Sequence, residues 1–221
     1  MIEHPRAEIW IALAAFLLAL TAPHVIRVTG AGAAQPSFHI DEAHKIAESY
    51  YYHLFFEAGD WTAPEWSEDF FARTNPPVAK YVFGVALALG GEHVHDQELQ
   101  QAFYTLWRNP DDLRGALPDR MLAITRFVSG LFGALACGLM ALVATRAGGI
   151  LAGIVAPLLL VLNPVFVYVA SRGLTDTIFL FHLLLVVPAS WGAIRALQRL
   201  VSDGPAGASP LVVLRGLVLP S

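Results

Sequence analysis

The first candidates for chemistry are two adjacent carboxylates, Asp41 and Glu42, which follow an apolar run from Ile9 to Ile26 after a short stretch of small and polar residues. A membrane-spanning helix needs roughly 20 mainly apolar residues, so this run comes close to the length that crosses a bilayer. A carboxylate just outside a membrane can act on a hydroxyl at the surface, because it removes the proton as the new bond forms. Asp41 also stands at the head of a predicted helix, where Asp is a common cap, so capping and catalysis both stay open.

Two further ionisable residues lie in or next to later apolar runs. Arg126 falls inside such a run, where a charge is costly enough to indicate a function, although a long side chain can also extend to the interface. Asp176 precedes a helix predicted to start at Thr177, and the alternative role for it is a helix cap. These residues are candidate partners of the acidic pair.

Histidines raise the question of a metal. His39 and His44 flank the acidic pair, and His93-Val94-His95 adds a second group, so a divalent metal is conceivable. The spacing matches no tight zinc motif, and solvated loop histidines are the alternative. We therefore predict no firm cofactor. His182, inside the last apolar run, is expected to bond another helix or to face a polar cavity.

Composition predicts an all-α integral membrane protein. Hydrophobic residues make up 56% of the chain, charged residues 14%, and mean hydropathy is +0.55. Four spans of suitable length are predicted, at about 9–26, 122–144, 150–170 and 177–194. A fifth apolar run begins at Leu211 and is too short to span, so we expect residues 1–221 to form one domain that is the N-terminal part of a larger membrane protein. Without a basic stripe, nucleic acid is not an expected partner.

Charge asymmetry predicts the orientation. Residues 27–120 hold 14 acidic and 7 basic residues, whereas the basic residues of the short loops are Arg6, Arg146, Arg195 and Arg199, with Arg172 alone on the other side. Basic residues of short loops stay in the cytoplasm, so we expect a cytoplasmic N-terminus in the plasma (inner) membrane and an extracytoplasmic segment 27–120. A cleaved signal peptide is the alternative for the first run, with small residues at 30–34 as the cleavage site.

The extracytoplasmic segment has its own helical signals. Apolar residues from Ala43 to Leu54 recur at spacings of three and four, which indicates an amphipathic helix near the membrane surface, with Gly59 following it. Pro76-Pro77 opens a second helix, Val78 to Leu89, which Gly90-Gly91 ends. Residues Gln97 to Trp107 suggest a third.

Several short motifs, in order along the chain, resemble those of polyprenol-phosphate-dependent glycosyltransferases of the C fold. These motifs are Phe38-His39-Ile40-Asp41-Glu42-Ala43-His44, Asn75-Pro76-Pro77-Val78-Ala79-Lys80, Arg126 with Gly130 and Gly133, Asn163-Pro164, and Ser171-Arg172-Gly173-Leu174-Thr175-Asp176. The protein O-mannosyltransferase branch is the nearest match, and the aminoarabinose transferase branch is related. Asn75 replaces the histidine of the mannosyltransferase pattern, so the sugar stays open.

The resemblance implies an enzyme that moves a sugar from a polyprenyl-phosphate carrier to a hydroxyl of a protein, lipid or glycan, with inversion. It implies Asp41 as the general base, with Glu42 orienting it. Arg126, and after it Lys80 and Arg73, are the expected ligands of the donor phosphate, since an arginine binds two phosphate oxygens at once. Asp176, Asn75 and His44 are expected auxiliary residues.

Two other classes of function remain open from the sequence. The first is a non-enzymatic or truncated membrane scaffold that binds a partner through its extracytoplasmic segment. The second is a small transporter, against which the scarcity of intramembrane ionisable residues and the missing inverted repeat both argue. Because a long lipid carrier needs a groove between helices, we also expect these residues alone to bind donor weakly or to turn over slowly.

Overall fold

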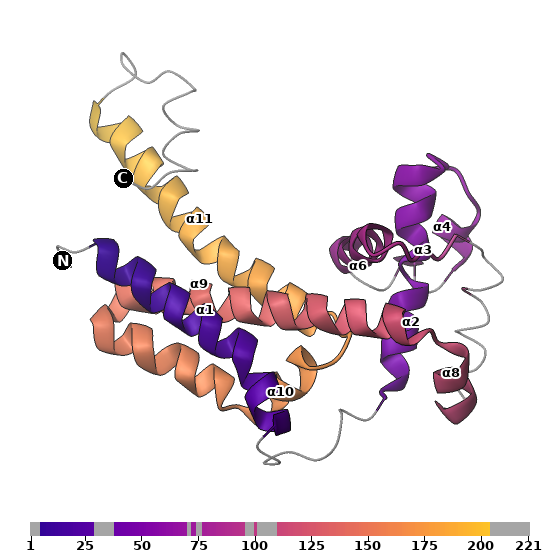
Figure 1. The fold of residues 1–221 in the computed structure, drawn as a ribbon. Coiled ribbons are helices and arrows are strands. Elements are labelled where there is room, and N and C mark those ends of the chain that lie inside the picture. The colour runs from indigo at the N-terminus through magenta and orange to yellow at the C-terminus, as the bar shows by residue number, and fades with distance from the viewer. Residues whose placement is uncertain are drawn as a thin grey trace.

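The computed structural model describes residues 5–28, 38–69, 72–73, 77–95, 100 and 110–203. Every regular element in these ranges is helical, which confirms the all-α prediction for the part of the chain described. Three long helices, α1 (Pro5–Val28), α9 (Asp119–Val161) and α11 (Asp176–Asp203), form an elongated bundle, and short helices gather at one end of it (Figure 1).

Helix α9 is bent rather than straight. It has 43 residues and would measure about 65 Å if straight, roughly twice the hydrocarbon thickness of a bilayer. The bend lies at Gly149, whose backbone (φ 83°, ψ −177°) is unfavourable for residues with a side chain. The two legs fold back beside each other with α1 alongside them (Figure 1). At this end of the bundle the Arg146 guanidinium pairs with Glu8 of α1, with Nε 3.0 Å from a carboxylate oxygen.

Within the described residues, two helices are long and apolar enough to cross a membrane, Asp119–Val161 and Asp176–Arg199. The prediction of four spans is therefore wrong. The apolar part of α1 that is described, Ala7–Thr21, is shorter than a span requires. The fourth predicted span, at about 177–194, coincides with α11.

The predicted span at 150–170 is interrupted by a helix end. α9 stops at Val161, and a separate helix, α10 (Pro164–Ala170), follows. The Asn163 carbonyl oxygen Oδ1 accepts hydrogen bonds from the amides of Val165 (2.8 Å) and Phe166 (3.3 Å), which makes Asn163 the cap of α10. Pro164 suits the first position of a helix because it has no amide hydrogen to lose.

The described part of the segment predicted to be extracytoplasmic, 27–120, folds into short helices around one apolar cluster. The predicted amphipathic helix from residue 43 to 54 is divided into α2 (Ile40–Ala47), α3 (Tyr50–Tyr52) and a π-helix, η1 (His53–Glu57). The first break occurs where the Ser49 hydroxyl and amide both donate to the Ile46 carbonyl, at 2.6 and 3.0 Å. The predicted second helix is confirmed as α6 (Pro77–Leu89).

Two short helices, α4 (Glu65–Glu68) and α8 (Pro110–Ala116), complete this end of the molecule. The apolar cluster includes Ile46, Tyr51, Leu87 and Leu113, each 0 to 1% exposed, and it reaches Leu122 at the start of α9. Of the third helix predicted for the segment, at 97–107, only Gln100 is described, and the apolar run from Leu211 falls outside the described residues.

Candidate functional site

Helix α2 begins with a reciprocal cap that positions the acidic pair. The His39 amide donates to Glu42 Oε2 at 2.9 Å, and the Asp41 amide donates to Nδ1 of His39 at 3.2 Å. The cap therefore consists of His39 and Glu42, and the interpretation of Asp41 as the capping side chain is not supported. Glu42 points inward from this cap, whereas Asp41 lies on the outer surface of the helix.

Glu42 joins three separate parts of the chain. Its side chain is fully buried and accepts hydrogen bonds from Nε and Nη2 of Arg126 at 2.7 and 2.9 Å. The amide of Gly173, in the turn before α11, donates to the same carboxylate at 2.9 Å. One carboxylate thus connects α2, the first leg of α9 and the 171–175 turn. The sequence predicts only that the acidic pair and Arg126 share a membrane face.

The surroundings of Glu42 keep it ionised. Burial alone would raise the pKa of this carboxyl, but the hydrogen bonds from Arg126, Gly173 and His39, together with the charge of Arg126, hold the pKa below its ordinary value. Glu42 is therefore an anion near neutral pH, and it accepts the hydrogen bonds that join these segments.

Asp41 is the accessible member of the pair. Its side chain is 52% exposed, and its two carboxylate oxygens lie 3.6 Å from Nδ1 of His39 and 3.8 Å from Nδ1 of His44. Burial lowers the pKa of His44, and the Asp41 carboxylate opposes that effect. The arrangement is a carboxylate open to solvent, with an imidazole on either side, on the capped end of α2.

A second cation borders this site. Arg172, 7% exposed, lies over the ring of Tyr168 at 3.6 Å from its centroid, and His39 meets the edge of the same ring at 6.2 Å. Asp176 is exposed at the first position of α11, three residues beyond the glycine that binds Glu42. Sequence reasoning missed Tyr168, whose only signal is its position one helical turn before Arg172.

No family model, no curated protein and no solved structure matches this chain. Its assignment must therefore come from the chemistry of the residues described above.

The other predicted phosphate ligands are placed differently. Lys80 is 2% exposed, donates to the Ala72 carbonyl at 3.0 Å and lies 4.9 Å from the centre of the Tyr51 ring. Burial lowers its pKa, opposed by the acidic side chains of Glu48 and Asp69. Lys80 is thus buried among the short helices at this end of the molecule. Arg73 is exposed, and Asn75 lies outside the described residues.

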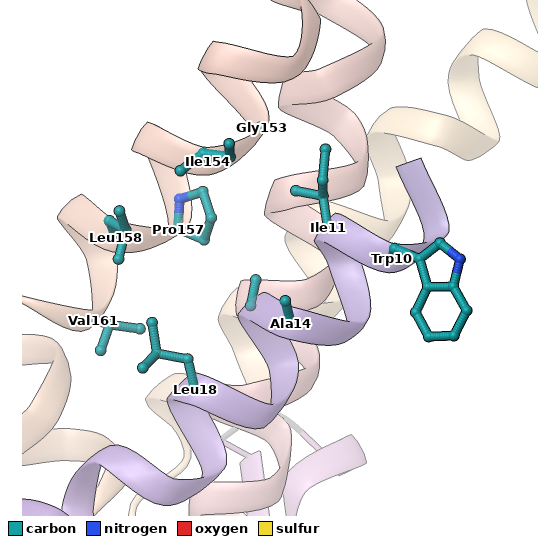
Figure 2. A pocket seen from close by; sticks show the side chains of 10 residues that line it. Trp10, Ile11, Ala14, Leu18, Gly153, Ile154, Pro157, Leu158 and Val161 are labelled. Carbon is teal, nitrogen blue, oxygen red and sulfur yellow. The ribbon is translucent and has the colours of Figure 1, made fainter. Parts of the chain in front are cut away.

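An apolar cavity of about 350 Å³ lies between α1 and the second leg of α9. Figure 2 shows α1 contributing Ala14 and Leu18 on one side, with Pro157 and Leu158 of α9 opposite. The remaining residues that line it are Trp10, Ile11, Ala15, Gly153, Ile154 and Val161. A cavity with this lining suits hydrocarbon.

Histidines gather in two places. His39 and His44 lie on Asp41, as described above. His93 and His95 instead contact His53 and Glu57 of η1, the π-helix that follows α3. This second group has the donor set of a metal site.

Proposed function

We propose that this chain carries part or all of a membrane glycosyltransferase that moves a sugar from a polyprenyl-phosphate carrier to a hydroxyl at the extracytoplasmic face. The observation that supports the proposal best is the contrast between two adjacent carboxylates. Glu42 is fully buried on Arg126 and the Gly173 amide, and Asp41 is half exposed on the same helix end. A rigid support beneath an accessible base is the arrangement that general base catalysis needs.

In the proposed reaction Asp41 takes the proton of the acceptor hydroxyl. The hydroxyl oxygen forms a bond to the anomeric carbon of the sugar as the bond from that carbon to the phosphate oxygen breaks. The electron pair of the broken bond leaves with the polyprenyl phosphate, and attack from the opposite side inverts the anomeric carbon. Assistance by the base is worth roughly 10²- to 10⁴-fold in rate.

The leaving phosphate gains negative charge, so nearby cations stabilise the transition state more than the ground state. The sequence predicts Arg126 as the main phosphate ligand, but two of its guanidinium nitrogens donate hydrogen bonds to Glu42. We therefore propose that Arg126 positions Glu42 and also contributes positive charge near the leaving phosphate. Arg172, beside His39 and Tyr168, is the second cation at this site, and we assign the phosphate to the field of both arginines.

The isoprenoid chain of the carrier requires an apolar path. The cavity between α1 and the second leg of α9 has that character (Figure 2). Acceptors of three kinds fit the proposal equally, namely a protein, a lipid or a glycan hydroxyl, and the sugar is unspecified.

The proposal is tested with the chain in proteoliposomes under single-turnover conditions, with protein in excess over a radiolabelled polyprenyl-phosphate sugar, so that slow transfer is still detected. We expect labelled product from the wild-type chain and almost none from Asp41→Asn. Equal product from the two contradicts the assignment of Asp41 as the base, whereas no product from the wild type contradicts transfer by these residues and favours the scaffold function.

A further inference from the structure

Four side chains of the extracytoplasmic segment place metal-binding atoms close together. The ligand atoms of His53, Glu57 and His95 all lie within 4.8 Å of one another. Nδ1 of His53 lies 2.8 Å from one Glu57 carboxylate oxygen, and Nδ1 of His93 lies 3.5 Å from the other. The His93 and His95 rings stack at 4.9 Å between centroids, and His95 meets His53 at 5.5 Å. Three imidazoles thus surround one carboxylate.

Two of these groups lie on an unusual turn of helix. In η1 the Ala58 amide donates to the His53 carbonyl at 2.8 Å, five residues back, which is the pattern of a π-helix. π-helical turns are rare and occur frequently at functional sites. This turn carries His53 at its first position and Glu57 at its last.

The remaining two groups come from the chain after α6. Helix α6 packs closely on α3 at Gly84, where an added Cβ would lie 2.1 Å from the Tyr52 Cβ. α6 then ends, and the chain turns at Gly91, which has a φ of +74°. Val94 is 3% exposed and belongs to the same apolar cluster as Leu54. Each histidine therefore lies beside a residue that the cluster holds in place.

We propose that His53, Glu57 and His95 bind a divalent transition-metal ion, with His93 as the fourth ligand, and that Zn²⁺ is the ion that this donor set fits best. Imidazole nitrogens and a carboxylate oxygen are zinc ligands, with bonds of about 2.0–2.2 Å in tetrahedral geometry. Such bonds set the ligand atoms roughly 3.4 Å apart, so side-chain shifts of about 1 Å close the group on an ion.

The environment of the group suits an ion that enters from water. The side chains of His53, Glu57 and His93 are 27, 31 and 34% exposed. Bound metal would connect η1 to the segment after α6 and so stabilise the extracytoplasmic segment, away from Asp41.

The test uses the whole chain, purified without a histidine tag and freed of metal by a chelator. Titration with Zn²⁺ should give one site per chain and raise the unfolding temperature. Because loss of an outer-shell partner already lowers metal affinity about 10- to 100-fold, His53→Gln and His95→Gln should each weaken Zn²⁺ binding by more than about 100-fold. His182→Gln, a change in α11, is the matched control and should bind Zn²⁺ like the wild type.

A rescue variant separates ligand loss from misfolding. His95→Cys keeps a zinc ligand, so it should retain the site, and Co²⁺ bound in place of Zn²⁺ should gain a thiolate charge-transfer band that the wild type lacks. The metal-free variants should match the metal-free wild type in helical circular dichroism. No Zn²⁺ binding by the wild type, equal affinity in all variants, or equal loss in His182→Gln would each overturn the proposal.

Discussion

Glu42 and Arg126 lie 84 residues apart in the chain and meet in a two-bond ion pair, with nitrogen to oxygen distances of 2.7 and 2.9 Å. The pair joins the short helices around α2 to the start of α9. It also fixes the helix end from which Asp41 extends. The stability of this junction and the chemistry proposed for Asp41 therefore depend on the same contact.

Replacing one member of the pair should be costly. Arg126→Gln leaves the Glu42 charge buried without its main partner, and breaking a buried ion pair in this way costs about 3–5 kcal/mol of unfolding free energy. The matched control is Arg146→Gln, which removes the more exposed pair with Glu8 at the other end of the bundle, for about 1 kcal/mol or less. Unfolding in detergent, followed by circular dichroism, measures both. Equal losses of unfolding free energy would show that the Glu42–Arg126 pair contributes no more to stability than the exposed pair.

The ion pair also predicts how stability depends on pH. Because the pKa of Glu42 is lowered in the folded protein, the unfolded state binds more protons once the pH falls toward the ordinary value of 4.5. This contribution to stability is complete above that value and is lost as the pH falls through the lower, folded pKa. Unfolding measured between pH 7 and 3 should show a smaller acid-dependent loss in Glu42→Gln than in the wild type. Parallel curves would contradict the prediction.

The packing of α3 on α6 gives a prediction that is independent of function. Gly84→Ala puts a methyl group into the space of the Tyr52 Cβ, and such overpacking costs about 1–3 kcal/mol of unfolding free energy. Gly115→Ala, in helix α8, meets nothing within 4 Å and should be neutral or stabilising by up to about 1 kcal/mol. The measured quantity is the difference in unfolding free energy between the two variants, and we expect Gly84→Ala to be the less stable. A Gly84→Ala variant more stable than Gly115→Ala would refute the described packing.

Arg172 offers a test of the proposed phosphate site. Arg172→Gln removes a cation beside His39 and Tyr168, and loss of one transition-state donor typically lowers the rate about 10²- to 10³-fold. Arg172→Lys keeps the charge and should retain more activity than Arg172→Gln. Sugar transfer and thermal unfolding are measured together, so that a loss of folding is recognised. Transfer unchanged in Arg172→Gln would remove this residue from the proposal.

Periodicity predicted some elements of the fold well. The apolar repeat between Pro76-Pro77 and Gly90-Gly91 predicts α6 to within one residue, because the prolines mark its start and the glycines its end. Hydropathy alone did not reveal the interruption at Asn163-Pro164 as a helix end, although a side-chain cap and a proline both indicate one. The apolar run continues through it, and a window average does not register a local hydrogen bond.

The candidate site was predictable in part. The Asp41, Glu42 and Arg126 region was identified from residue types, since charges next to apolar runs are rare. The pairing of Glu42 with Arg126 and with the Gly173 amide depends on contacts between distant segments, which no spacing encodes. The same limit hid the group formed by His53, Glu57 and the two later histidines, since these come from η1 and from the chain after α6.

The most direct measurement compares Asp41→Asn with Asp111→Asn in single-turnover sugar transfer. Both residues are exposed acids at the second position of a short helix, so loss of a helix-end charge affects both variants alike. We predict that Asp41→Asn lowers the transfer rate by about 10²- to 10⁴-fold while Asp111→Asn transfers at the wild-type rate. Transfer by Asp41→Asn at the wild-type rate would contradict the central claim that this carboxylate is the base.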